Sequence, residues 1–264
     1  MTRPVRIAVQ IQPQHAPDYG RIRDAVRRAE DAGVDIVFTW DHFFPLFGDP
    51  GGAHFECWTM LAAFAEQTER VEIGALVSSA GYRNPDLLAD MARTVDHISG
   101  GRLILGVGSG WFERDYDEYG YEFGTAGSRL KLLAEYLPRV KDRLGKLIPP
   151  PNRHIPVLIG GGGEKKTLPL VAQYADIWHS FCDIEAYSRK AGILADRCAD
   201  NGRNPESIAH STMWPGMDDA ATYVDAGVTL FTVHVGGPEF DLTELKRAIA
   251  WRDENTPPPL SGLA

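Results

Sequence analysis

The sequence of 264 residues contains only three cysteines, Cys57, Cys182 and Cys198. Their number is odd and no two form a Cys-x-x-Cys pair, so the sequence predicts neither a disulfide framework nor a structural zinc site. The histidines lack the spacing of metal ligands, and we expect no metal. The scarcity of cysteine and the lack of a signal-peptide pattern at the N-terminus predict a cytoplasmic protein.

Long apolar runs and clusters of basic residues are also missing. No segment reaches the ~18 consecutive apolar residues that a membrane-spanning helix needs, so no membrane partner is expected. Lysine and arginine are dispersed along a chain whose formal net charge is −9, which argues against a nucleic-acid partner. An anionic ligand would need a local group of donors to hold it against the overall negative field.

What the sequence does contain is a regular alternation of strand-like and helix-like segments. The predicted strands cover residues 5–12, 35–40, 71–79, 103–109, 155–159, 176–179, 207–213 and 229–235. The predicted helices cover residues 18–33, 55–68, 85–99, 128–144, 165–174, 184–201, 218–226 and 242–253.

This order is typical of the α/β class, as a single (β/α)8 TIM barrel. An open, doubly wound sheet is the main alternative, and it would need fewer strands or a further domain. We place the barrel at residues 1–255. We expect the proline-rich tail, residues 256–264, to be loosely held.

Two glycine-rich segments follow predicted strands. Gly106, Gly108 and Gly110 alternate at the end of residues 103–111, where the absence of a Cβ would let a flat ligand lie against the backbone. The alternative is a buried strand that ends in a glycine-rich turn. The carboxyl end of barrel strands is where active sites lie, which favours ligand binding.

The second segment contains four glycines at residues 160–163 and leads into a predicted helix. The free N–H groups of that helix's first turn would form an anion site, and Lys165 or Lys166 could add positive charge. The segment is not a P-loop, because the Gly-Lys-Ser/Thr ending is missing. A flexible loop is the alternative.

Polar side chains stand at the ends of other predicted strands. Asp41 and His42 end the second strand, where an acid and an imidazole suit proton transfer. The alternative is a turn-capping Asp beside a solvent-facing His. The remaining strand-end candidates are Gln10, Gln12, Ser78, Ser79, Tyr82, Trp178 and His179. Trp178 could equally belong to the core.

Several stretches resemble the luciferase-like flavin and deazaflavin oxidoreductases, particularly those that use coenzyme F420. They are FTWDHFFP (38–45), YRNPDLLADMARTVDHISGGRLILGVGSGW (82–111) and IPVLIGGGGEKKTL (155–168), and ADIWH (175–179) also fits. The resemblance implies a (β/α)8 barrel with a deazaflavin across its carboxyl-terminal mouth. It also implies a non-proline cis peptide near residues 76–78.

The resemblance further implies roles for individual residues. His42 would lie next to the reacting ring and carry the proton, and Asp41 would orient either the ring or His42. Residues implied to contact the cofactor ring and ribityl chain are Val77, Ser78, Gly108, Ser109 and Gly110. Those implied to hold its phosphate are Gly161, Gly162 and Gly163, and those implied to line the substrate are Trp111, Tyr82, Trp178 and His179.

One departure bears on the substrate. Trp111 stands where a sugar-phosphate dehydrogenase branch carries an acidic catalytic residue, which argues against sugar-phosphate oxidation.

The resulting hypothesis is an F420-dependent oxidoreductase that transfers a hydride between the deazaflavin and a small organic substrate. An FMN-dependent luciferase-like monooxygenase is one alternative, because both cofactors share the phosphate and the ribityl chain. A non-catalytic F420-binding protein is the other. We expect the chain to form a homodimer, with a small-molecule substrate as its ligand.

Overall fold

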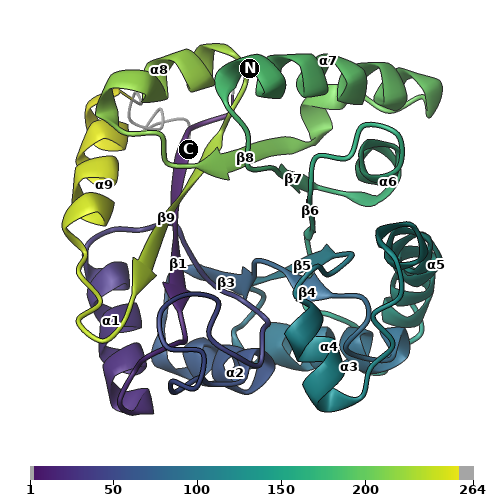
Figure 1. The fold of residues 1–264 in the computed structure, drawn as a ribbon. Helices are drawn as coiled ribbons and strands as arrows, with labels where there is room; N and C mark the ends of the chain where they lie inside the picture. Colours follow the sequence, from purple (N-terminus) through teal and green to yellow (C-terminus); the bar gives the residue numbers. More distant parts are fainter. Residues whose placement is uncertain (1–2, 256–264) are drawn as a thin grey trace.

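The computed structural model describes residues 3–255, which form a closed barrel of parallel strands with helices outside it (Figure 1). The strand order is β3-β2-β1-β9-β8-β7-β6-β5-β4, and a further pairing of β3 with β5 closes the barrel. The strands are β1 (Arg6–Gln12), β2 (Ile36–Thr39), β3 (Glu72–Ala75), β4 (Ser78–Ser79), β5 (Leu103–Gly108), β6 (Val157–Gly160), β7 (Ile177–His179), β8 (Ala209–Met213) and β9 (Leu230–Gly236). The predicted TIM barrel is confirmed.

The helices surround the barrel, and local sequence signals fix where several of them begin. Asp18 accepts a hydrogen bond from the backbone N–H of Arg21 at the start of α1, and Asn84 caps α3, which has Pro85 in its first turn. The helices are α1 (Tyr19–Asp31), α2 (Cys57–Gln67), α3 (Pro85–Ile98), α4 (Glu113–Tyr119), α5 (Ala126–Leu144), α6 (Thr167–Tyr174), α7 (Ile184–Asp200), α8 (Met217–Asp225) and α9 (Thr243–Asn255).

The prediction of one continuous strand over residues 71–79 is wrong. This segment is split into β3 and β4, and a cis peptide joins Leu76 to Val77 between them. Both halves pair with β5. The cis peptide lies within the expected range of residues 76–78.

Side chains alternate between the inside of the barrel and the layer beneath the helices. The inner core consists of Ala8, Ile36, Phe38, Leu76, Ile104, Leu158, Ile177 and Leu230. A much larger apolar layer fills the space between the strands and the helices. Residues above the inner core, at the carboxyl ends of the strands, therefore face a common space.

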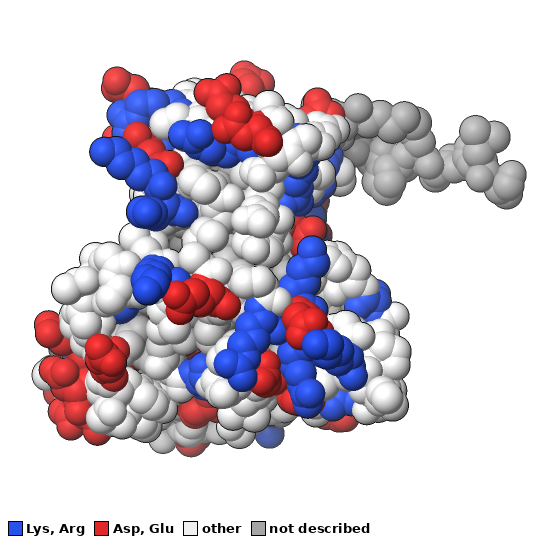
Figure 2. Space-filling model, turned by 90° about the vertical axis from the view of Figure 1, so that its right-hand side faces the viewer, with Lys and Arg blue, Asp and Glu red and all other residues white. Residues whose placement is uncertain are grey.

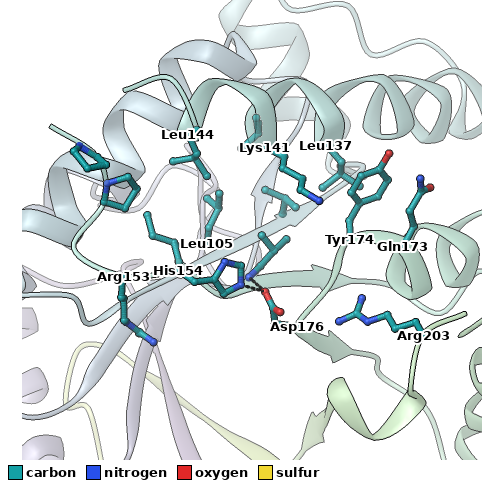
Figure 3. A pocket seen from close by; sticks show the side chains of 17 residues that line it. Leu105, Leu137, Lys141, Leu144, Arg153, His154, Gln173, Tyr174, Asp176 and Arg203 are labelled. Carbon is teal, nitrogen blue, oxygen red and sulfur yellow. Dashed lines mark hydrogen bonds and ion pairs between the residues drawn. The ribbon is translucent and has the colours of Figure 1, made fainter. Parts of the chain in front are cut away.

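The outer wall of the barrel is less covered between α5 and α6. A cavity of about 520 Å³ lies there, with apolar side chains such as Leu105 on the wall and Lys141 and Arg203 at its edge (Figure 3). The molecule narrows on this side, between an upper and a lower lobe that both carry basic side chains (Figure 2). In residues 3–255, no helix combines the length and the apolar character needed to cross a membrane.

Candidate active site

The carboxyl ends of the strands enclose a cavity of about 500 Å³. It brings together most of the residues singled out in the sequence, although they come from the ends of many different strands. The predicted residues that line it are Gln10, Asp41, His42, Val77, Ser79, Tyr82, Gly108, Ser109, Gly110, Trp111, Gly161 and His179. Gln12, Ser78, Gly162, Gly163 and Trp178 do not line it.

His42 is oriented by a carboxylate from a distant part of the chain. Its Nδ1 lies 2.6 Å from Oδ2 of Asp115, on α4. The same buried carboxylate accepts hydrogen bonds from the Tyr82 hydroxyl at 2.6 Å and from the backbone N–H of Phe43 at 3.0 Å. Within residues 3–255, Nε2 of His42 makes no hydrogen bond, and the ring lines the cavity.

These contacts favour the ionised form of Asp115. Burial alone would raise the pKa of its carboxyl, but the hydrogen bonds from His42 and Tyr82 outweigh burial and lower the pKa below its ordinary value. An ionised Asp115 accepts the proton on Nδ1 and leaves Nε2 of a neutral imidazole as an acceptor toward the cavity. Of the two roles expected for Asp41, the orientation of His42 belongs to Asp115 instead, and the orientation of the cofactor ring stays a prediction.

Asp41 is instead held in a buried ion pair. Both of its carboxylate oxygens accept hydrogen bonds from Arg83, at 2.5 and 3.1 Å, and Arg83 also contacts Glu56 at 2.7 Å. Burial raises the pKa of Asp41, and the Arg83 guanidinium opposes that rise. For Arg83, burial acts to lower the pKa, but Asp41 and Glu56 raise it overall. This bidentate pair occupies Asp41 and ties the end of β2 to the loop before α3.

Val77 forms one wall of the cavity, and we call this wall the Val77 shelf. Cβ atoms built on Gly108 and Gly160 would lie 2.7 and 3.1 Å from its methyl groups, and one on Gly106 would meet the carbonyl of Ala75. These glycines therefore make room for the broken third strand. A flat ligand can rest on Val77, rather than on bare glycine backbone as the sequence suggested.

Gly110 has a different role from the other glycines. Its φ of +80° favours glycine, and a Cβ there would meet the hydroxyl groups of Tyr116 and Ser79. Trp111 follows at the mouth, 63% exposed, with its ring centroid 5.8 Å from that of His42.

Two of the predicted site residues have side chains that face the helices instead of the cavity. Ser78 is buried and accepts a hydrogen bond from Nε1 of Trp58, on α2, at 2.9 Å. Trp178 stacks on Tyr187 of α7, and its Nε1 donates to the carbonyl of Gly161. Because side chains alternate along a strand, the inward position of His179 places Trp178 outside the barrel.

The glycine run at residues 160–163 offers a group of open backbone donors. Within the described residues, the N–H groups of residues 162–166 make no hydrogen bond. The first N–H groups of α6, those of Thr167 and Leu168, are taken by the carbonyl of Gly163, so the expected helix-turn site is wrong in detail. The open donors belong to the loop instead.

Lys190 is a functional candidate that the sequence did not reveal. A Cβ on Gly162 would lie 2.7 Å from Nζ of Lys190 and 2.6 Å from Oγ of Ser180. Lys190 lies on α7 and forms no ion pair within residues 3–255. It can add positive charge to the loop donors. Over the same residues, no three His, Cys, Asp or Glu side chains gather in a way that could hold a metal.

Comparison with known proteins gives a family match and several relatives. A model of the luciferase-like monooxygenase family matches residues 4–216. An F420-dependent glucose-6-phosphate dehydrogenase of Amycolatopsis mediterranei is 33% identical over 168 residues, which cover 56% of this chain and 48% of that enzyme. The pyrimidine monooxygenase RutA of Stutzerimonas stutzeri is 26% identical, over 74% of this chain and 60% of that enzyme. The chain thus spans about half to two thirds of the length of these relatives.

Two solved structures share the fold. An F420-dependent secondary alcohol dehydrogenase in complex with an F420-acetone adduct superposes with a TM-score of 0.83 at 15% identity, covering 95% of this chain and 99% of that one. The coenzyme F420-dependent tetrahydromethanopterin reductase from Methanopyrus kandleri gives a TM-score of 0.71 at 15% identity, covering 96% and 99%.

Proposed function

The chain belongs to the luciferase-like monooxygenase family, and from this we propose that it is an F420-dependent oxidoreductase acting on a small organic substrate. The observation that carries the proposal is His42, whose Nδ1 is fixed by Asp115 and whose Nε2 is open at the cavity. The 33% identical relative, which is F420-dependent, supports the choice of cofactor.

The residues present fit a flat phosphorylated cofactor. The Val77 shelf and the backbone of Gly108–Gly110 would hold the ring. The open N–H groups of the loop, including those of Gly162 and Gly163, would hold the phosphate together with Lys190, while Gly161, whose N–H donates to the carbonyl of His179, would contribute only its lack of a side chain. When bound there, a deazaflavin would supply the hydride chemistry, as donor in reduction of the substrate and as acceptor in its oxidation.

The chain itself supplies the proton transfer. Hydride transfer to a carbonyl carbon leaves charge on its oxygen, and a positioned acid lowers that barrier. Protonated His42 would donate from Nε2 in the direction of reduction, and neutral His42 would accept there in the direction of oxidation. Asp115 is a positioning residue that stabilises the imidazolium and fixes the tautomer.

An FMN-dependent monooxygenase is the second candidate. The match to RutA covers more of this chain than the match to the dehydrogenase does. The phosphate and ribityl contacts are common to both cofactors and do not separate these functions.

A cofactor titration tests the choice. We expect the purified protein to bind F420 at least about tenfold more tightly than FMN, or roughly 1.4 kcal/mol, measured by fluorescence. Equal affinity, or tighter binding of FMN, would contradict the proposal. We also propose that the chain forms a homodimer in the cytoplasm, and sedimentation analysis tests its oligomeric state.

A further inference from the structure

Two histidines line the cavity without a part in the proposed proton transfer. His179 ends β7, beside β6, and His234 lies on β9. In the strand order, β9 stands across the barrel from β5, the strand on which the Val77 shelf packs (Figure 1). A flat ring on the shelf would therefore leave His234 facing the ring's open side.

Both imidazoles have a nitrogen without a partner. The Nε2 atoms of His179 and His234 are buried, and neither forms a hydrogen bond within residues 3–255. Nδ1 of His179 is already bonded to Oγ of Ser211 at 2.8 Å, which leaves only Nε2 for a ligand. Buried polar atoms in folded proteins nearly always have a partner, so these two nitrogens indicate a place where a ligand supplies it.

The surroundings make the two rings neutral. Burial lowers the pKa of His179 to about 3, with a smaller effect from His234, and burial also lowers the pKa of His234. Phe181 lies against both rings, with centroids 4.8 Å from His179 and 6.2 Å from His234. A neutral imidazole presents either a donor or an acceptor at Nε2.

Within residues 3–255, no permanent cation lines this cavity, and the positive charge of a protonated His42 is balanced by the ionised Asp115. Among the residues that line it there is neither lysine nor arginine, and its one lining carboxylate, Asp41, is bound by Arg83. A carboxylate or phosphate on the substrate would leave water without gaining a counter-ion, which is strongly unfavourable. A hydroxyl, carbonyl or amide group loses far less and can bond to a neutral imidazole.

We propose that His179 and His234 anchor the substrate through an uncharged oxygen, so that this site takes neutral compounds with an apolar body and rejects anionic ones. The inference rests on the proposed function, because it places the cofactor ring on the Val77 shelf and the substrate on the side of β9. Phe47, Trp111 and Phe181 supply the apolar surface for the body of such a substrate.

The test uses protein labelled with nitrogen-15 in its histidines and saturated with F420. Cyclohexanecarboxamide is the neutral probe, and cyclohexanecarboxylate is the charged probe with the same ring. The carboxamide should shift the side-chain nitrogen signals of His179 and His234 with saturation. The carboxylate should need at least about tenfold higher concentration, because its charge has no partner in the cavity.

Substitutions assign the effect to the two rings. His234→Phe keeps a flat ring but removes Nε2, and it should weaken carboxamide binding about fivefold while F420 affinity changes less than about twofold. His179→Asn keeps an uncharged hydrogen-bonding group and should weaken binding less. His154→Phe alters an exposed imidazole on the outer wall and is the matched control, with no change expected.

Several results would overturn the inference. These are the absence of shifts at both histidines, equal binding of the carboxylate, or an F420 affinity about tenfold weaker in His234→Phe, which would assign the rings to the cofactor. Failure of the unaltered protein to bind F420 would instead count against the proposed function. Titration of the cofactor-free protein with the carboxamide then still decides whether the histidine pair binds a neutral oxygen.

Discussion

Asp115 connects three parts of the cavity wall through one carboxylate. It accepts hydrogen bonds from His42 and Phe43 after β2 and from Tyr82 after β4, while it lies itself on α4. Each partner is fixed relative to the others by a buried charged acceptor, and hydrogen bonds to charged groups are the stronger kind. The orientation of the imidazole is therefore built into the fold.

We expect Asp115→Asn to lower turnover by at least about tenfold, because an amide no longer stabilises the imidazolium or selects one tautomer. Cofactor affinity should change little, since the loop donors are untouched. The pH profile of kcat should shift as well, which a purely structural role would not produce. Asp117→Asn, an exposed change on the same helix, is the control. An unaltered pH profile in Asp115→Asn would remove Asp115 from the mechanism.

His42→Ala tests the proposed proton carrier itself. Cofactor binding should persist, and turnover should fall about 10²–10⁴-fold, the usual contribution of one acid–base group. Steady-state rates with a working substrate and a parallel F420 titration measure the two effects. Unchanged turnover would contradict the role of His42.

The sequence allowed His42 to be placed but not its partner. A residue that directly follows a barrel strand faces the mouth, so His42 could be located from strand order, whereas Val77 lies within the predicted strand over residues 71–79 and was indicated only by the family resemblance. Asp115 is 73 residues away in sequence and lies on a short polar helix whose pattern resembles surface. Only the folding of the chain brings Asp115 into contact with the His42 imidazole.

At the scale of elements, the loop between β6 and α6 is the site that we propose for the cofactor phosphate. Its N–H groups remain open because α6 begins at Thr167, two residues later than the sequence indicated. The carbonyl of Gly163 accepts hydrogen bonds only from the first helical N–H groups, those of Thr167 and Leu168. A larger residue at Gly162 would collide with the side chains of Ser180 and Lys190.

Gly162→Val should therefore reduce cofactor affinity by at least about tenfold with little loss of stability, because the added side chain displaces Lys190 and blocks the backbone donors. F420 titration and thermal unfolding measure the two properties. Gly127→Val is the matched control, since a Cβ at Gly127 has its nearest neighbour 3.7 Å away. Normal cofactor affinity in Gly162→Val would place the phosphate elsewhere.

The positions of strands and helices could be predicted where the hydrophobic periodicity is strong. The predictions were wrong where contacts between distant residues change the local structure. The predicted strand over residues 71–79 keeps its apolar pattern to the end, yet it breaks because Val77 enters space left by glycines on β5 and β6. α4 was missed because its seven residues contain little apolar surface. The tail, residues 256–264, lies outside the described residues.

At the scale of the whole molecule, buried neutral histidines link stability to pH. Burial lowers the pKa of His179 to about 3 and those of His54 and His210 to about 4. Their unfolded values lie near 6.5. Between about pH 6.5 and 4 the unfolded chain therefore binds more protons than the folded one, and the free energy of unfolding must fall as pH falls through this range.

We expect each of these histidines to contribute about 1 kcal/mol per pH unit to this slope. His210→Gln, which keeps a neutral partner for Tyr187, should flatten the dependence by roughly that amount. Urea unfolding at pH 7, 6 and 5 measures it. His97→Gln, an exposed change on α3, is the control. A slope unaffected by His210→Gln would show that His210 is protonated as readily in the folded chain as in the unfolded one.

The Val77 shelf has a consequence for how this cavity could be reshaped. The Val77 side chain sets the depth of the cavity beneath a ligand. It packs against Gly108 on β5 and Gly160 on β6. Val77→Ala would vacate a recess the size of two methyl groups, bounded by backbone that has no side chains to fill it. Bulkier ring systems could then be admitted by changing a single position, while the hydrogen-bonded barrel around it stays as it is.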